Sequence, residues 1–203
     1  MKIIAHKIEN IPQAKKALAA GANFVEIDVA KRIIFTKFTT QHHGIKGKFG
    51  IGENLESILS AVPPYKLLLD IKHANLSFTF VKKLSGLLTV NNIKNARICG
   101  RDWQVISQVC QKTGCLPFYT FAKVKDFEKL KRKLPSLEKP AGFSIRYTLI
   151  DQDFIRNLKS LFPTSEIWSW TVNEAKEMKR FQKLGVDGII TDNFAEMLLF
   201  KRD

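Results

Sequence analysis

The sequence predicts an α/β fold, a single TIM (β/α)8 barrel with a β-arm after its second strand, from three observations. Short apolar runs alternate with helical patterns along the 203 residues, which is typical of a parallel sheet covered by helices. Apart from the arm, these runs number eight, and eight such repeats close a barrel. Linkers and low-complexity stretches do not interrupt the pattern, so we expect one domain over residues 1–203.

The first elements are marked by a proline and a glycine. Ile3–His6 is a short apolar run that ends in a polar residue. Ile11–Ala20 has a helical pattern, with Pro12 in its first turn and Gly21 just past its end, which is where these two residue types favour helix starts and stops. Phe24–Val29 then forms the second predicted strand.

An arm follows the second strand. Ile33–His42 is rich in β-branched and aromatic residues and begins after only a tight connection. A parallel crossover needs a dozen or more residues, so we predict that this run folds back antiparallel, with His42 and His43 at its tip. The glycine-rich segment Gly44–Gly52 is expected to be a mobile loop.

The rest of the chain repeats a regular alternation of helices and strands. In chain order the predicted segments are helix Glu53–Ala61, strand Lys66–Ile71, helix Leu76–Leu88, strand Ala96–Cys99, helix Asp102–Lys112, strand Leu116–Thr120, helix Lys125–Leu134, strand Gly142–Arg146, helix Asp151–Leu161, strand Glu166–Val172, helix Glu174–Leu184, strand Asp187–Thr191 and a closing helix from Phe194.

Acidic residues end two of these strands. A barrel of this type has its active site at the carboxyl ends of its strands. Glu26 and Asp28 are two residues apart, so their side chains point the same way, and Asp70 ends the next strand. Clustered carboxylates are tolerated mainly around a cation, although Asp28 could instead cap a turn at a solvated strand end. Three carboxylates without thiolates favour Mg²⁺ or Ca²⁺ over zinc.

Histidines and lysines share the predicted rim. His6 ends the first strand and His43 lies at the arm tip, and histidine titrates near neutrality, which suits acid–base catalysis. The alternatives are a core residue at His6 and an exposed loop residue at His43. Lys7 and Lys72 would add point charges for a phosphate, and Trp170 is placed to line the mouth. This constellation fits hydrolysis or intramolecular transfer at a phosphodiester.

Several motifs, in the right order from residue 3 to about residue 198, resemble those of the glycerophosphodiester phosphodiesterases. They are Ala5–Lys7, GANFVEIDV at Gly21–Val29, the His43 tip, LLLDIK, WTVN at Trp170–Asn173 and GVDGIITDN at Gly185–Asn193. The resemblance implies a TIM barrel that binds a divalent metal and hydrolyses glycerophosphodiesters to an alcohol and glycerol 3-phosphate. By carry-over it assigns the metal to Glu26, Asp28 and Asp70, acid–base catalysis to His6 and His43, and phosphate contact to Lys72.

The sequence departs from the family pattern at three of these positions. His6 is followed by Lys7 where the family usually has arginine, and lysine cannot reproduce a bidentate grip on phosphate. His43 precedes glycine rather than aspartate, and Asp70 replaces a longer glutamate. The short first loop and the Asp-x-Lys strand end instead resemble the sphingomyelinase D branch, which acts on choline phospholipids and commonly gives a cyclic phosphate. Lysophospholipids are therefore the alternative substrates.

The net charge of the chain indicates possible partners, and its cysteines indicate a compartment. A net charge of +14 predicts a field that concentrates anions, including phosphorylated metabolites, anionic lipid surfaces and nucleic acid. A catalytically silent barrel that binds a polyanion is a second alternative, disfavoured by the intact acids and histidines. The basic helix Lys123–Lys133 is interpreted as a solvated barrel helix, with a membrane or nucleic-acid contact as the alternative. Arg146 and Asp192 are interpreted as substrate contacts or rim pairs. Three sparse cysteines favour a reducing cytoplasm, with a peripheral membrane association as an option.

Overall fold

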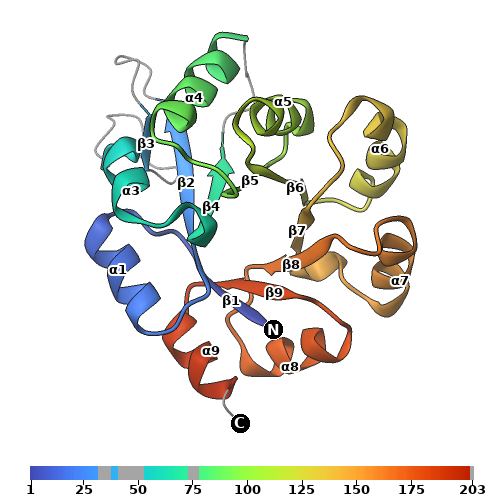
Figure 1. The fold of residues 1–203 in the computed structure, drawn as a ribbon. Coiled ribbons are helices and arrows are strands. Elements are labelled where there is room, and N and C mark those ends of the chain that lie inside the picture. Colours follow the sequence, from blue (N-terminus) through green and yellow to red (C-terminus); the bar gives the residue numbers. More distant parts are fainter. Residues whose placement is uncertain (32–37, 41–52, 73–77, 202–203) are drawn as a thin grey trace.

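A computed structural model of the chain describes residues 1–31, 38–40, 53–72 and 78–201. Eight parallel strands form a closed ring in the order β1-β9-β8-β7-β6-β5-β4-β2, and β1 pairs with β2 to complete it (Figure 1). The strands of the ring are β1 (Lys2–Ala5), β2 (Phe24–Lys31), β4 (Leu67–Ile71), β5 (Arg97–Gly100), β6 (Leu116–Phe121), β7 (Gly142–Arg146), β8 (Glu166–Trp170) and β9 (Gly188–Thr191). The predicted TIM barrel is confirmed.

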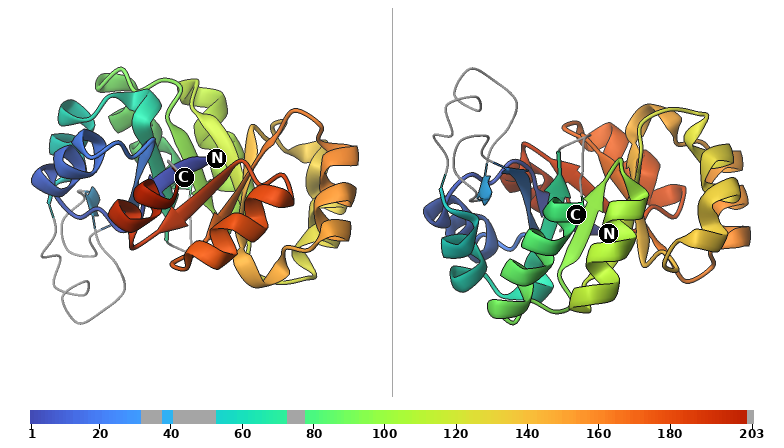
Figure 2. Two further views of the ribbon diagram at one scale, coloured as in Figure 1. Left: turned by 90° about the horizontal axis from the view of Figure 1, so that it is seen from below. Right: turned by 90° about the horizontal axis from the view of Figure 1, so that it is seen from above.

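Helices surround the ring in chain order, as the view along the barrel and the two side views show (Figures 1 and 2). They are α1 (Ile11–Ala19), α3 (Leu55–Ala61), α4 (Phe78–Val90), α5 (Trp103–Thr113), α6 (Asp126–Lys133), α7 (Gln152–Leu161), α8 (Ala175–Lys183) and α9 (Phe194–Phe200), with 3₁₀ turns η1 (Pro64–Lys66), η2 (Leu134–Ser136) and η3 (Tyr147–Leu149). The predicted strand Glu166–Val172 ends two residues early, at Trp170.

The predicted arm is present as β3 (Phe38–Thr40), which pairs antiparallel with the end of β2. The register joins Val29 to Thr40 and Lys31 to Phe38. The predicted mobile loop Gly44–Gly52 and the arm tip with His42 and His43 lie outside the described residues.

Side-chain caps mark the beginning of several helices. Asn10 accepts a hydrogen bond from the Gln13 backbone N–H at 2.9 Å and begins α1. Asp151 accepts from the Phe154 N–H at 2.8 Å and begins α7. Such caps satisfy backbone donors that would otherwise be orphaned, at about 1 kcal/mol each. The caps fix where these helices begin, and the hydrogen bonds between neighbouring strands of the ring keep the strand ends close to one another.

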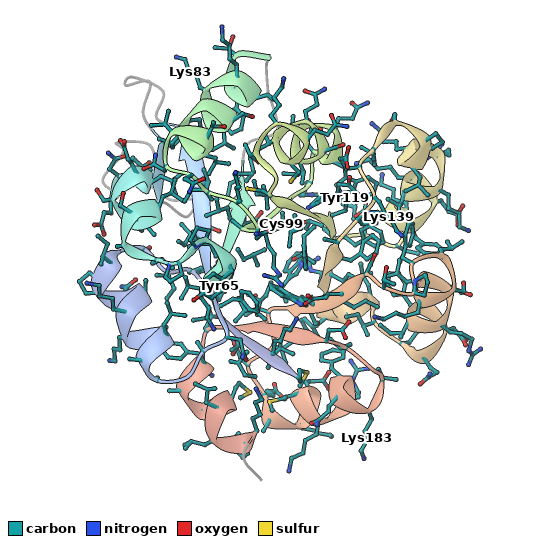
Figure 3. The ribbon with its side chains drawn as sticks, in the orientation of Figure 1. Tyr65, Lys83, Cys99, Tyr119, Lys139 and Lys183 are labelled. Atoms are coloured by element: carbon teal, nitrogen blue, oxygen red, sulfur yellow. The ribbon has the colours of Figure 1, made fainter. Side chains whose placement is uncertain are left out.

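Two apolar layers hold the barrel. The larger lies between the strands and the helices, and the smaller fills the inside of the ring. The inner layer consists of Ile4, Phe24, Leu68, Cys99, Phe118, Trp168 and Ile190. A Cβ on Gly142 would lie 2.4 Å from the Phe118 ring, so only glycine leaves room for that aromatic side chain. Cys99 lies near the middle of the ring, whereas Lys83 on α4 and Lys183 on α8 lie at the periphery of the molecule, outside the ring (Figure 3).

A charged cluster closes the amino-terminal end of the ring. Glu166 accepts hydrogen bonds from Lys2 Nζ at 2.7 Å, Trp168 Nε1 at 2.7 Å and an Arg97 guanidinium nitrogen at 3.2 Å. The same guanidinium lies 4.2 Å from the centre of the Phe24 ring, a distance suited to cation–π attraction. Every charge in this cluster therefore has an opposite charge or an aromatic face beside it.

In the part of the chain that the structure describes, no helix has the length and apolar character needed to cross a membrane.

Candidate active site

Three carboxylates meet at the carboxyl end of β2 and β4. Glu26 and Asp28 are almost fully buried and Asp70 is half-buried. One oxygen from each lies within 4.8 Å of the others. Asp28 and Asp70 are direct partners in the register of the two strands, a position in which like charges repel. Oxygen donors at this spacing, gathered at a cost in repulsion, fit a hard divalent cation such as Mg²⁺ or Ca²⁺.

The Lys72 ammonium lies within this acidic cluster. Its Nζ is 2.8 Å from Asp28 Oδ1 and 4.0 Å from Glu26 Oε1, and it donates to Asp70. Burial alone would lower the pKa of Lys72, but the three carboxylates hold it well above its usual value. Burial raises the pKa of Glu26 well above its usual value, and the charges of Asp28 and Asp70 add to this rise. One ammonium thus compensates only part of the charge of three acids.

His6 faces the same cluster in a defined tautomer. Its Nδ1 lies 2.8 Å from Asp192 Oδ1, and its Nε2 lies 3.9 Å from Glu26 Oε2. A carboxylate accepts hydrogen bonds only, so Nδ1 carries the hydrogen and the lone pair of the neutral ring is on Nε2. Burial lowers the pKa of His6, although the hydrogen bond to Asp192 opposes that shift. A neutral ring with its basic nitrogen toward the acids is ready for proton transfer.

Asn173 fixes the carboxylate that orients His6. Its Nδ2 donates to Asp192 Oδ2 at 2.9 Å. Its Oδ1 accepts from the Asp192 backbone N–H at 2.9 Å and from Thr191 Oγ1 at 3.0 Å. Burial alone would raise the pKa of Asp192, but the bonds from Asn173 and His6 lower it below its usual value. The chain from Asn173 through Asp192 to His6 therefore holds the imidazole in place.

Lys7 and Trp170 complete the rim. The Lys7 side chain is exposed, and its backbone N–H donates to Glu26 Oε2 at 2.8 Å. Lys7 has a left-handed backbone, with a φ of 53°, a conformation that costs a non-glycine residue roughly 1–2 kcal/mol. Trp170 is half-buried, and the Arg146 guanidinium lies 5.7 Å from its ring centre.

A cavity of about 650 Å³ joins these groups, a size that suits a small organic ligand. Its lining includes His6, Lys7, Glu26, Asp70, Lys72 and Trp170. The structure thus brings together, in and beside one cavity, all the predicted site residues that it describes, with Asp28 beside its ligand partners. His43, the second predicted histidine, lies outside the described residues.

Sequence reasoning did not assign some residues of this cavity. Arg101 lines it from the β5–α5 connection, and Lys129 and Lys133 line it from α6, the helix interpreted above as a solvated barrel helix. The available signal was the spacing of Lys129 and Lys133, which puts both on one helix face. The role of Asn173 was also missed, although it stands in the WTVN motif.

A scan against protein-family models matches residues 56–196 to the glycerophosphoryl diester phosphodiesterase family. The chain belongs to this family. The match contains Asp70, Lys72 and Trp170, whereas His6, Glu26 and Asp28 precede it. Membership indicates a hydrolase of the phosphodiesterase class. A search of curated proteins found no significant match.

Solved structures of this family share the fold. One is a glycerophosphodiester phosphodiesterase from Thermotoga maritima, with 20% identity, a TM-score of 0.76 and coverage of 99% of this chain and 97% of that one. Another, from Parabacteroides distasonis, has 18% identity, a TM-score of 0.79 and the same coverage. A phosphodiesterase from Oleispira antarctica, solved in complex with the product sn-glycerol-3-phosphate, has 12% identity and a TM-score of 0.79, covering 100% and 97%. At these identities the likeness concerns the fold.

Proposed function

We propose that the protein is a metal-dependent phosphodiesterase that hydrolyses glycerophosphodiesters to an alcohol and glycerol 3-phosphate, and that residues 1–203 act as one domain. The observation that carries the proposal is the convergence of Glu26, Asp28 and Asp70 within 4.8 Å, with His6 Nε2 directed at them. Family membership and the glycerol 3-phosphate bound to the Oleispira antarctica relative support the same substrate class.

The three carboxylates would hold Mg²⁺ or Ca²⁺. Such an ion, when bound, polarises a phosphoryl oxygen and stabilises developing negative charge. His6 Nε2 moves a proton at one end of the reaction, either from the attacking hydroxyl or water or to the leaving alcohol. His43 is proposed for the other end. Lys7 and Lys72 are proposed to contact phosphate, and Trp170 to border the substrate.

Phosphorus NMR with glycerophosphocholine, in Mg²⁺ and in a chelator, tests this function. We expect glycerol 3-phosphate to form in Mg²⁺ only. His6→Ala should abolish turnover while the far-ultraviolet circular dichroism remains that of the parent, because the half-buried imidazole contacts the rim rather than the apolar core. Full activity in His6→Ala would contradict the assignment, as would turnover that the chelator does not affect.

A second candidate is the same chemistry on a lysophospholipid at an anionic membrane. Val124, after β6, is 78% exposed between Lys123 and Lys125, and Tyr147, after β7, is 41% exposed beside Arg146. Apolar side chains flanked by cations suit an anionic interface. Lysophosphatidylcholine in the same NMR assay would give a cyclic phosphate under this alternative. Vesicle binding that ignores both lipid charge and salt would count against it.

A further inference from the structure

The cavity extends beyond the acids to a wall of opposite charge. Glu26 and Asp70 line it at β2 and β4, whereas Arg101, Lys129 and Lys133 line it at the β5–α5 connection and α6. We call these three residues the cationic wall. The mechanism described above uses none of them, and their alignment along a cavity distinguishes them from the lysines that keep the outer surface solvated.

Two residues of the wall are held in place by the helix and by an aromatic ring. Lys129 and Lys133 are four residues apart on α6, so they project from one face of the helix. Both are half-buried, whereas Lys131, on the opposite face, is exposed. Lys129 Nζ lies 4.3 Å from the centre of the Trp103 ring, and Trp103 is itself buried, with its Nε1 donating to the Thr120 carbonyl at 3.2 Å.

Within the described ranges of the chain, the wall has no paired carboxylate. Among the described residues, no salt bridge joins Arg101, Lys129 or Lys133 to a carboxylate, whereas Lys131 pairs with Glu128 at 2.9 Å. The nearest acid in sequence, Asp102, also lines the cavity, but its Oδ1 caps α5 by accepting from the Val105 N–H at 3.4 Å. Cations along a low-dielectric cleft attract an anion that can replace the missing partners.

A polar atom without a hydrogen-bond partner among the described residues lies in the same cavity as the wall and the acids. Thr120, at the end of β6, lines the cavity and is only 8% exposed. Its hydroxyl oxygen is buried and has no hydrogen-bond partner among the described residues. Buried polar atoms are nearly always paired, so this hydroxyl is available to a ligand that fills the cavity.

We propose that the cationic wall selects glycerophosphodiesters that carry a second anionic group, a phosphate or carboxylate, on one of the two alcohols. This inference rests on the proposed function. With the phosphodiester at the acids, the second anion would contact Lys129, Lys133 and Arg101. A cationic headgroup such as choline would meet three like charges there, which disfavours it.

The test compares three substrates of the wild type in Mg²⁺: glycerophosphoinositol 4-phosphate, glycerophosphoinositol and glycerophosphocholine. Hydrogen bonds to charged groups predict a kcat/KM about 10- to 100-fold higher for the 4-phosphate than for glycerophosphoinositol. Glycerophosphocholine should be the poorest of the three. Lys129→Gln should reduce the ratio between the two inositol substrates by about tenfold.

Lys131→Gln is the matched control, because it removes the same charge from the opposite face of the same helix. It should leave the ratio between the two inositol substrates as in the parent. Equal rates on both inositol substrates, or an equal fall of the ratio in Lys129→Gln and Lys131→Gln, would overturn the selectivity while leaving the phosphodiesterase intact.

A binding measurement separates the selectivity from the activity. Calorimetry with inositol 1,4-bisphosphate and inositol 1-phosphate reports the wall without turnover. We expect the bisphosphate to bind about tenfold more tightly, and Lys129→Gln to remove that difference. If no substrate is cleaved, the proposed function fails. Tighter binding of the bisphosphate would still support the selectivity of the cationic wall. Equal affinities for the two inositol phosphates would overturn it.

Discussion

The two ends of the barrel are built from the same strands, yet the balance of acidic and basic side chains differs between them. At the amino-terminal end, Glu166 has Lys2, Arg97 and the Trp168 N–H within 3.2 Å. At the carboxyl end, Glu26, Asp28 and Asp70 share Lys72. In the described part of the chain, one end surrounds a single acid with two cations and an indole N–H, and the other gathers three acids around one ammonium.

The pKa directions record this difference. Burial alone would raise the pKa of Glu166, but Lys2, Arg97 and Trp168 lower it below its usual value. The pKa of Glu26 rises through burial and through its acidic neighbours. A compensated carboxylate stabilises the fold, whereas an undercompensated group in a cavity marks a functional site. We therefore expect the cluster at the closed, amino-terminal end to stabilise the barrel and the acidic cluster at the open, carboxyl end to lower its stability until a ligand binds.

The largest expected effect is on turnover. Glu26→Gln keeps the shape of the side chain and an acceptor for the Lys7 N–H but removes a charge from the acidic cluster. We expect kcat/KM on a glycerophosphodiester to fall by about 10²- to 10³-fold. Glu166→Gln is the control at the opposite end and should keep nearly all the activity. Comparable losses in both variants would remove the functional distinction between the ends.

The orientation of His6 should have the next largest effect. Asp192→Asn removes the charge that fixes the imidazole through Nδ1, and we expect kcat to fall by about 10- to 100-fold, as for outer positioning groups. KM should change much less, because Asp192 contacts His6 and Asn173. Asp192→Glu should recover part of the rate. A fall confined to KM would instead make Asp192 a substrate contact.

For the free energy of unfolding, we expect the substitution at the amino-terminal end to be the harmful one. With a chelator present, Glu166→Gln should lower the free energy of unfolding by about 1–2 kcal/mol, because charged hydrogen bonds to Lys2 and Arg97 are lost at a partly exposed site. Glu26→Gln should raise it by about 1–2 kcal/mol, since it removes a buried and poorly compensated charge. Urea unfolding measures both. Destabilisation in Glu26→Gln would show that Lys72 compensates the acids fully.

Lowering the pH should remove the contribution of Glu166 to the free energy of unfolding. A carboxyl whose folded-state pKa lies below its unfolded value stabilises the fold above the unfolded pKa, about 4.3, and loses that contribution as pH falls through the folded value. The difference in the free energy of unfolding between the parent and Glu166→Gln should therefore shrink between about pH 5 and pH 3. A difference that stays constant would mean that the charge of Glu166 is not what stabilises this end.

The sequence predicts the open end better than the closed one, for a physical reason. Glu26, Asp28 and Asp70 stand at strand ends, where alternation and barrel topology suffice to bring them together. The closed end depends on Lys2, Arg97 and Glu166, three ordinary charges on distant strands that meet only through the register of the whole ring. No local pattern distinguishes these three from solvated residues.

The same reasoning limits the prediction of individual contacts at the rim. Lys72 follows Asp70 in the expected motif, but its position among the acids depends on side-chain geometry that spacing does not specify. The sequence favours a solvent-exposed helix for Lys129 and Lys133, because basic helices are usually solvent-exposed. Only the placement of α6 beside the mouth reveals their orientation toward the cavity.

The ion pair between Lys2 and Glu166 joins residues 164 positions apart, and this separation has a kinetic consequence. Closing so long a loop has an entropic cost, so we predict that the pair forms late in folding, after β1 and β8 have joined the ring. Contacts made after the transition state influence the rate of unfolding far more than the rate of folding. On this prediction the contact between Lys2 and Glu166 slows the unfolding of the finished barrel and leaves its rate of folding nearly unchanged.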